Sequence, residues 1–301
     1  MTRGHGILLI VAASMLWGMD SLFRRPLTQL FSPVTIVFLE HLVLVLMMLP
    51  LLLLSSTAVR SLRKRDWAAL AVIAIGGSVA ATSLFTFAIK HGNPSVTVLL
   101  QKTQPLFTLL LARRLLLEKA GLRFWSCLIP AAAGAYLVST PDWRSGLSVD
   151  PKQPESILAA VGASALWGAS TVLGRYVVPR VPVFVLTGLR FGIALPVLAI
   201  LFAAQPAASR ALPATLGGWA TLTAMALLPG MAALVLYYKG LQTTPATMAS
   251  IAELAFPVTA VTVNWLVLGA RLSSSQCLGG AILVAAVTFL TFKESRSQTA
   301  G

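Results

Sequence analysis

Apolar segments of about 18 residues or more recur along almost the whole chain, separated by short polar stretches. A helix needs about 20 residues to cross the hydrocarbon core of a bilayer, so each segment predicts a membrane-spanning helix. The expected fold class is all-α: a polytopic membrane protein with ten transmembrane helices. The expected spans run approximately over residues 6–23, 34–54, 67–89, 94–112, 122–139, 156–174, 183–204, 216–238, 245–268 and 275–292.

The balance of residue types agrees with a membrane protein. Only 11% of the 301 residues are charged and 57% are hydrophobic, whereas a soluble protein keeps about a quarter of its residues charged. The formal net charge of +14 comes from short basic clusters between apolar segments, such as Arg60 to Arg65. Such clusters set membrane orientation and contact anionic lipid headgroups. We therefore expect the lipid bilayer, and no nucleic acid, as their partner.

The basic residues are unevenly divided between the two expected membrane faces. Fourteen of the 23 Lys and Arg residues fall on one set of alternate loops and seven on the other, while Lys102 and Arg190 lie inside spans. Because positive charge accumulates on the cytoplasmic side, both termini are expected to be cytoplasmic. The seven residues expected on the periplasmic side are Arg24, Arg25, Lys90, Arg144, Lys152, Arg210 and Arg271.

The two halves of the sequence repeat one another. The segment SMLWGMDSLFRR, beginning at Ser14, matches SALWGASTVLGR, beginning at Ser164, at an offset of 150 residues. Pro105 of the fourth expected helix similarly matches Pro257 of the ninth, at an offset of 152. Matches that recur in order across several helices indicate an internal duplication.

The duplication predicts how the chain is organised. We expect a first repeat over residues 1–139, a periplasmic linker over 140–155, and a second repeat over 156–301 that ends in a short cytoplasmic tail. Five helices per repeat is an odd number, so the second repeat enters the membrane inverted. Inverted repeats are a transporter architecture, with the substrate site near the membrane midplane between them.

Ten helices in an inverted five-plus-five repeat, each half opened by an SxLWG motif, resemble the EamA family of the drug/metabolite transporter superfamily. Repeats of that family continue to a Leu-Gly-Glu-Arg element, which this chain keeps in part. LLLEK has Glu118 without the glycine, and VLGAR has Gly269 but Ala270 in place of the glutamate. Among subgroups the chain most resembles the YddG-type amino acid exporters. The resemblance implies a multi-pass secondary carrier, usually an exporter, in the bacterial inner (plasma) membrane.

A polar stripe on the ninth expected helix is the strongest site prediction. A charged side chain in mid-bilayer costs about 2.5–3.5 kcal/mol, so it normally faces a cavity or a partner. Glu253 shares one helical face with Ser250 and Pro257. Its repeat mate is Gln101, whose face also holds Gln104. These stripes predict opposite walls of one central cavity, with polar contact between helices as the alternative.

Other polar groups inside the spans have two interpretations each. Lys102 points about 100° away from the preceding residue, so it either pairs with Asp20 or Glu40 or contacts substrate. Arg190 is expected to anchor its helix near a membrane face or to serve an ion pair. His41 is expected to be structural, with a proton relay as the alternative.

The aromatic residues of the spans divide in the same way. Trp17, with Asp20 on its face, and its mate Trp167 form either cavity wall or packing, while Tyr237 and Tyr238 are expected to be interface anchors. The predicted substrate-binding residues are Trp17, Asp20, Gln101, Lys102, Gln104, Trp167, Ser250 and Glu253. The predicted hinge residues are Gly76, Gly77, Pro105, Pro229, Gly230 and Pro257, because glycine and proline mark places where helices bend.

Motifs of other protein classes are absent from the sequence. There is no GxxxxGK[ST] phosphate loop, no HExxH and no GxSxG. Cys127 and Cys277 do not make a zinc set, and their places toward opposite membrane faces argue against a disulfide. We therefore expect no enzyme, no catalytic residue, no metal and no cofactor.

The function expected from the sequence is secondary transport. A monomer exporting amino acids or related small metabolites by alternating access is the leading hypothesis. The alternative within transport is a multidrug exporter of lipophilic organic cations. Minor alternatives are an intramembrane enzyme and a non-transporting accessory subunit.

Overall fold

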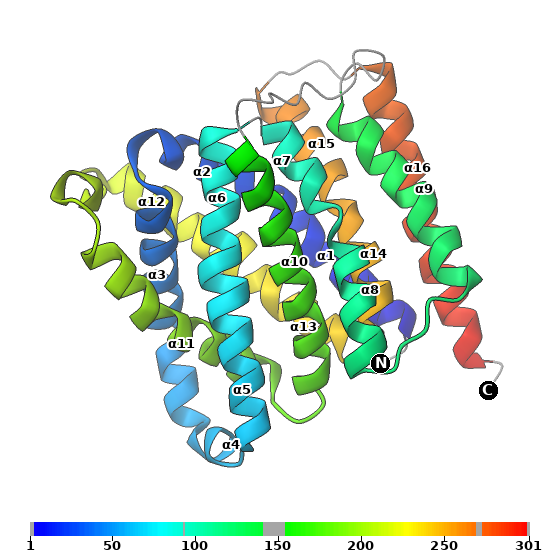
Figure 1. Cartoon of the computed structure of the whole chain (residues 1–301), viewed down its shortest axis with the longest axis horizontal. Coiled ribbons are helices and arrows are strands. Elements are labelled where there is room, and N and C mark those ends of the chain that lie inside the picture. Colours follow the sequence, from blue (N-terminus) through cyan, green and yellow to red (C-terminus); the bar gives the residue numbers. More distant parts are fainter. Residues whose placement is uncertain (1–2, 93, 141–153, 269–272, 300–301) are drawn as a thin grey trace.

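The computed structural model describes residues 3–92, 94–140, 154–268 and 273–299, and all regular structure in these ranges is helical (Figure 1). The first half contains α1 (Arg3–Gly18), α2 (Asp20–Leu30), α3 (Pro33–Leu54), α4 (Ser56–Arg60), α5 (Lys64–Val72), η1 (Ile73–Ala80), α6 (Ala81–His91), α7 (Pro94–Gln101), α8 (Gln104–Leu115) and α9 (Leu122–Ser139). The second half contains α10 (Pro154–Val177), α11 (Val183–Ala203), η2 (Ala207–Arg210), α12 (Leu216–Met225), η3 (Ala226–Ala232), α13 (Ala233–Leu241), α14 (Ala246–Ala252), η4 (Glu253–Ala255), α15 (Phe256–Leu268) and α16 (Ser274–Thr299).

Eight helical stretches of the described residues are long and apolar enough to cross a membrane, judged by length and composition. They confirm the prediction of an all-helical polytopic membrane protein. A shorter apolar helix, Phe124–Ser139, lies within α9. The eight stretches are Gly4–Leu30, Pro33–Leu54, Lys64–His91, Pro154–Val177, Val183–Ala203, Leu216–Leu241, Ala246–Val267 and Ser274–Thr291.

The fourth predicted helix is divided in two, which differs from the single span expected. α7 ends at Gln101 and α8 begins at Gln104. Its counterpart in the second half changes at the matching place, where the 3₁₀ turn η4 begins at Glu253. Each irregularity precedes a proline, Pro105 or Pro257, whose missing N–H and bulky ring disrupt the hydrogen bond to the residue four before it. The duplicated prolines thus account for duplicated breaks.

The third and eighth predicted helices each contain a π-helical segment at nearly equivalent places. η1 joins α5 to α6 and contains Gly76 and Gly77, while η3 joins α12 to α13 and contains Pro229 and Gly230. π-helical turns are rare and occur frequently at functional sites. Four predicted hinge residues therefore lie where the helices depart from α geometry. Their movement stays a prediction.

The two halves traverse the bundle in opposite directions (Figure 1). Both termini lie at one end of the bundle, whereas α9 stops and α10 starts at the other end. Helices of the two halves alternate in the packing: α1 packs on α13, α3 on α11, and α10 on α6 and α8. The centre of the molecule is therefore built jointly by both halves.

α9 and α16 pack against each other through glycine. A Cβ on Gly134 would lie 2.8 Å from the main-chain oxygen of Gly279, and a Cβ on Gly279 would lie 2.7 Å from that of Gly134. Small residues at such contacts let membrane helices approach closely. Cys127 in α9 and Cys277 in α16 are not joined by a disulfide.

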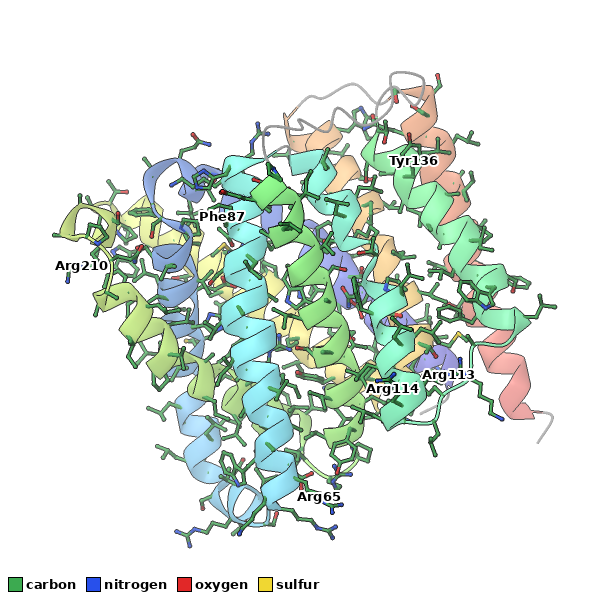
Figure 2. All side chains as sticks on the ribbon, viewed as in Figure 1. Arg65, Phe87, Arg113, Arg114, Tyr136 and Arg210 are labelled. Atoms are coloured by element: carbon green, nitrogen blue, oxygen red, sulfur yellow. The ribbon has the colours of Figure 1, made fainter. Side chains whose placement is uncertain are left out.

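The outer surface carries many exposed apolar side chains, as expected for a lipid-facing bundle (Figure 2). Leu110 and Ile200, for example, are 67% and 69% exposed. Arg65, Arg113 and Arg114 lie in the part of the bundle nearer the termini. Lipid tails can cover such apolar side chains without the penalty that water would impose.

Candidate substrate cavity

A cavity of about 160 Å³ lies at the centre of the bundle, between the two halves. One water molecule needs only about 10–15 Å³ of such space, so the cavity can hold several waters or a small organic solute. All eight predicted substrate-binding residues line it, although their part in binding stays a prediction. They are Trp17, Asp20, Gln101, Lys102, Gln104, Trp167, Ser250 and Glu253.

The carboxylate of Glu253 is held by donors from three other helices. It accepts hydrogen bonds from the Tyr237 hydroxyl at 2.8 Å and from Gln104 Nε2 at 2.7 Å, with Thr171 Oγ1 at 3.5 Å. Gln104 belongs to the first half and the other two donors to the second. The repeat-related polar stripes of the fourth and ninth predicted helices therefore meet directly, at this carboxylate.

Serines of the SxLWG motifs satisfy the carbonyl groups at the helix breaks. Ser14 Oγ donates to the main-chain oxygen of Glu253 at 2.7 Å, and Ser164 Oγ donates to that of Gln101 at 3.3 Å. Each carbonyl lies four residues before a proline, which cannot donate to it. In a bilayer an unsatisfied carbonyl is costly. The motif serine of each repeat thus supports the broken helix of the other repeat.

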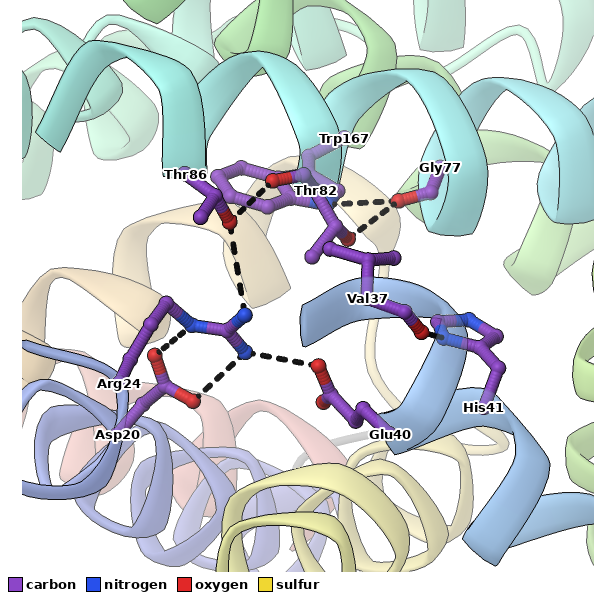
Figure 3. Close-up of polar contacts among 9 residues, drawn as sticks. All are labelled: Asp20, Arg24, Val37, Glu40, His41, Gly77, Thr82, Thr86 and Trp167. Carbon is purple, nitrogen blue, oxygen red and sulfur yellow. Dashed lines mark hydrogen bonds and ion pairs between the residues drawn. The ribbon is translucent and has the colours of Figure 1, made fainter. Parts of the chain in front are cut away.

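A buried ionic cluster forms another part of the wall (Figure 3). Arg24 donates to both oxygens of Asp20, at 2.9 Å from Nη2, and also to Glu40 Oε2 at 3.0 Å. Its Nη1 lies 3.5 Å from Thr86 Oγ1. The expected pairing of Lys102 with Asp20 or Glu40 is therefore wrong, because Arg24 pairs with both acids.

Arg24 itself was expected in a periplasmic loop, and this expectation is also wrong. α2 continues the first predicted helix to Leu30, so Arg24 is a buried residue with 4% of its surface exposed. Asp20 lies one turn before it on the same helical face. Because Asp20 on the same helix pairs with it, the guanidinium of Arg24 can stay inside the bundle.

Lys102 faces the second half of the protein at the break between α7 and α8. Its Nζ lies 4.0 Å from the centre of the Phe256 ring and 3.5 Å from Gln101 Oε1. A cation over an aromatic face is stabilised by the ring quadrupole, more strongly where water is excluded. Lys102 and Glu253, a basic and an acidic side chain, both line the cavity.

Arg190 is buried in the bundle and lines the cavity, so it does not anchor its helix at the outer surface of the bundle. Its Nε donates to Ser78 Oγ at 2.6 Å and its Nη1 to the Tyr238 hydroxyl at 2.9 Å. Among the described residues it has no carboxylate partner, so the expected ion pair is absent there as well. Tyr238 is completely buried and 4% of Tyr237 is exposed, so neither is the interface anchor that was expected.

Aromatic side chains supply much of the remaining wall. Trp17 packs against Tyr237 with ring centres 5.1 Å apart, and Trp167 packs against Phe85 at 5.2 Å. The indole N–H of Trp167 donates to the Gly77 carbonyl at 3.0 Å (Figure 3). Both motif tryptophans therefore line the cavity and also pack against its walls. The two interpretations offered by the sequence are compatible.

Comparison with known proteins agrees with this architecture. A model of the EamA-like transporter family matches residues 4–140 and 155–292. The chain belongs to the EamA-like transporter family. A relative, the riboflavin transporter ImpX of Fusobacterium nucleatum subsp. nucleatum, is 30% identical over 300 residues, covering 94% of this chain and 96% of the relative. A solved crystal structure shares the fold with a TM-score of 0.79 at 19% identity, covering 97% of this chain and 98% of that one.

Membership in the EamA-like family makes this chain a multi-pass membrane transporter. The sequence could not show every residue of its cavity. Arg24, Thr171 and Tyr237 were missed, although the spacing of Asp20 and Arg24 at i,i+4 was a readable signal for the first. Of the predicted hinge residues, Pro105, Pro229 and Gly230 line the cavity.

Glu118 of the partly kept family element caps a helix of the other repeat. Its carboxylate accepts hydrogen bonds from the main-chain N–H of Ala246 and of Thr247, each at 2.9 Å, and from Thr247 Oγ1 at 2.7 Å. These N–H groups open α14 and have no partner within the helix. The equivalent Ala270 lies outside the described residues.

Proposed function

We propose that this EamA-like transporter is a secondary carrier for a small organic solute of no net charge. In this proposal ten membrane segments form an inverted five-plus-five repeat, and the central cavity opens alternately to either side. Helices that are broken at matching places in the two repeats support it, because discontinuous helices supply substrate sites in inverted-repeat transporters. The positive-charge bias supports a bacterial inner-membrane location with both termini in the cytoplasm.

The balance of charge around the cavity is the observation on which the substrate class rests. Three basic side chains, Arg24, Lys102 and Arg190, and three acidic ones, Asp20, Glu40 and Glu253, line it. A solute that carries net charge would leave a buried charge uncompensated, which is costly in a membrane interior. This balance favours uncharged polar or zwitterionic solutes over the lipophilic cations of the alternative hypothesis.

Two solute types fit these walls, and each is favoured by a specific observation. The aromatic rings of Trp17, Trp167 and Phe85 offer faces on which a planar heterocycle can stack. Together with the riboflavin transporter relative, they make riboflavin the first candidate. The oppositely charged Lys102 and Glu253 would suit a zwitterion, so amino acids remain the second candidate. Export is the direction we propose for either solute.

Uptake into proteoliposomes tests the proposal. Purified protein is reconstituted and given labelled riboflavin, a mixture of labelled amino acids, or labelled tetraphenylphosphonium, each with and without a pH gradient. Riboflavin or amino acid uptake above that of empty liposomes supports a carrier of net-neutral solutes. Uptake of the phosphonium alone would overturn the proposed substrate class, and uptake of none would count against both candidates. The pH gradient shows whether transport is coupled to protons.

A further inference from the structure

Three polar groups on one side of the cavity have hydrogen-bonding capacity that the protein leaves unused. Within the described residues Arg190 uses its Nε and one N–H of Nη1, although a guanidinium has five N–H donors. Ser170 Oγ and His41 Nε2 are buried and have no hydrogen-bond partner. Ser170 is 5% exposed and His41 is 3% exposed. Buried polar atoms are nearly always paired, so unpaired ones on residues that line a cavity require a physical explanation, and a bound ligand is one.

Arg190 and Ser170 are neighbours in space, and His41 lies on the helix that packs along that of Arg190. A Cβ placed on Gly77 would lie 3.0 Å from Arg190 Nη2 and would collide with Ser170 Oγ, so both groups flank this glycine. The His41 ring stands edge-on to Phe191, the residue after Arg190, with ring centres 5.2 Å apart. α3, which carries His41, packs along α11, which carries Arg190. All three side chains line the cavity.

The hydrogen bond of the other His41 nitrogen determines what the free nitrogen can do. Nδ1 lies 2.8 Å from the Val37 carbonyl oxygen (Figure 3). A carbonyl only accepts, so Nδ1 must carry the proton. In the neutral ring Nε2 is then an acceptor. The residues that line the cavity therefore include two with unused donors, Arg190 and Ser170, and one with an unused acceptor, His41.

We propose that Arg190, Ser170 and His41 form a subsite for a carbonyl–N–H edge of the solute, such as the imide edge of a planar heterocycle. The solute carbonyl accepts from Arg190 and Ser170, and the adjacent N–H donates to His41 Nε2. An amino acid could place its carboxylate on Arg190, but its ammonium, the group left to donate to Nε2, would then lie close to the guanidinium and be repelled by it. The subsite rests on the proposed function and, within it, selects imide-bearing heterocycles over amino acids.

Modifying the ligand gives the first test. Riboflavin carries an imide N–H, which its N3-methyl derivative lacks, and binding of both to the purified full chain is followed by flavin fluorescence. A buried acceptor left without its partner should weaken binding of the methyl derivative at least about tenfold. Equal affinity for the two compounds overturns the subsite. Failure of the wild-type protein to bind either riboflavin or uracil, a small ring with the same imide edge, also overturns the subsite.

Modifying the protein gives the second test. His41→Phe removes the acceptor, so riboflavin should bind as weakly as its methyl derivative and the discrimination should vanish. His91→Phe is the matched control, because His91 stacks on Phe87 away from the cavity and its loss should leave discrimination intact. Discrimination that persists in His41→Phe would contradict the assignment. Melting temperatures in detergent show whether each variant is folded.

A pair of glycine variants keeps the proposal testable if His41→Phe does not fold. Gly77→Ala forces Arg190 and Ser170 apart, whereas a Cβ on Gly76 meets only Leu166 Cδ2 at an ordinary 3.5 Å. Riboflavin binding should fall about tenfold in Gly77→Ala and stay unchanged in Gly76→Ala. Equal effects in both variants would contradict the subsite.

The subsite and the transport function can fail separately. Normal discrimination between riboflavin and its methyl derivative without any uptake into proteoliposomes would refute the transport function and leave the subsite standing.

Discussion

The hydroxyl of Ser14 donates to the main-chain oxygen of Glu253 at 2.7 Å, across the boundary between the two repeats. Ser164 stands in the same relation to Gln101. This reciprocal pattern gives the SxLWG motif a physical reason: each repeat carries a proline that removes a hydrogen bond, and the other repeat supplies a side-chain donor to the carbonyl concerned. The two halves consequently depend on each other for stability as well as for the cavity.

Replacing either motif serine should therefore destabilise the protein. Ser14→Ala and Ser164→Ala each remove a hydrogen bond from a buried hydroxyl to a main-chain carbonyl at a helix break, which costs about 0.5–1.5 kcal/mol. Melting temperature in detergent should fall by several degrees in both. Ser61→Ala is the control, because its hydroxyl bonds Ala58 on the exposed surface and its loss should cost under about 0.5 kcal/mol. A Ser14→Ala variant as stable as the control would contradict this role.

Glu253→Gln should separate function from folding. Its repeat mate is Gln101, so the fold accommodates an amide of the same length at the equivalent place. The carboxylate accepts from Tyr237 and Gln104, and an amide retains only one oxygen for them. In the proposed site the carboxylate also binds the solute, and loss of that charge-assisted bond is worth about 1.5–3 kcal/mol, so uptake should fall about ten- to a hundredfold. Glu155→Gln, on an exposed residue at the start of α10, is the control.

Uptake and melting temperature are measured on the same preparations of both variants. Wild-type uptake by Glu253→Gln combined with a lower melting temperature would assign the carboxylate a purely structural role. Asp20 would then become the next candidate for a functional acid.

Arg24→Gln should be among the most disruptive single changes. It leaves the buried Glu40 and the partly buried Asp20 without their shared cation, and breaking a buried pair in this way costs about 3–5 kcal/mol. Neutralising all three residues, as Asp20→Asn with Arg24→Gln and Glu40→Gln, removes the repulsion and should restore much of the folded yield. Yield and melting temperature of the single and triple variants are compared. A triple variant no better than the single one would argue against electrostatic repulsion as the cause.

Pro229→Ala tests bending at η3. Alanine restores a main-chain donor and favours a regular helix, so the segment should stiffen and turnover in proteoliposomes should slow several-fold. Pro196→Ala removes a proline from within α11, at an exposed position that does not line the cavity, and should leave turnover near that of wild type. Equal turnover in both variants would exclude Pro229 as a hinge.

Orientation is tested by labelling single cysteines with an impermeant maleimide on intact cells. In a background of Cys127→Ser and Cys277→Ser, a cysteine at Ser148 should react and one at Ser61 should not, because the larger positive charge marks the cytoplasmic side. Permeabilised cells, in which both should react, provide the control. The opposite pattern would reverse the proposed topology.

The sequence predicted the parts of the site that the duplication makes visible. Glu253 and Gln101 stood out because each occupies an apolar helix at matching positions before a proline. Arg24 could not be placed in the same way, because hydropathy alone ends a helix where charges begin, and only the contact with Asp20 and Glu40 keeps it buried. Tyr237 likewise resembles an interface residue in the sequence, because nothing in the linear pattern shows its hydrogen bond to Glu253. Contacts between helices distant in sequence are the information that a linear pattern lacks.

The pairing of Asp20 with Arg24 has a consequence for how the protein is made. Both residues belong to α2, so their ion pair forms inside one segment of a nascent chain, before any later helix exists to receive either charge. Glu40 follows on α3, and the cluster is complete when the first helical hairpin has entered the bilayer. Arg190 emerges much later and meets Ser78, which is already in place. Synthesis from the N-terminus thus delivers Arg24 together with both of its acidic partners.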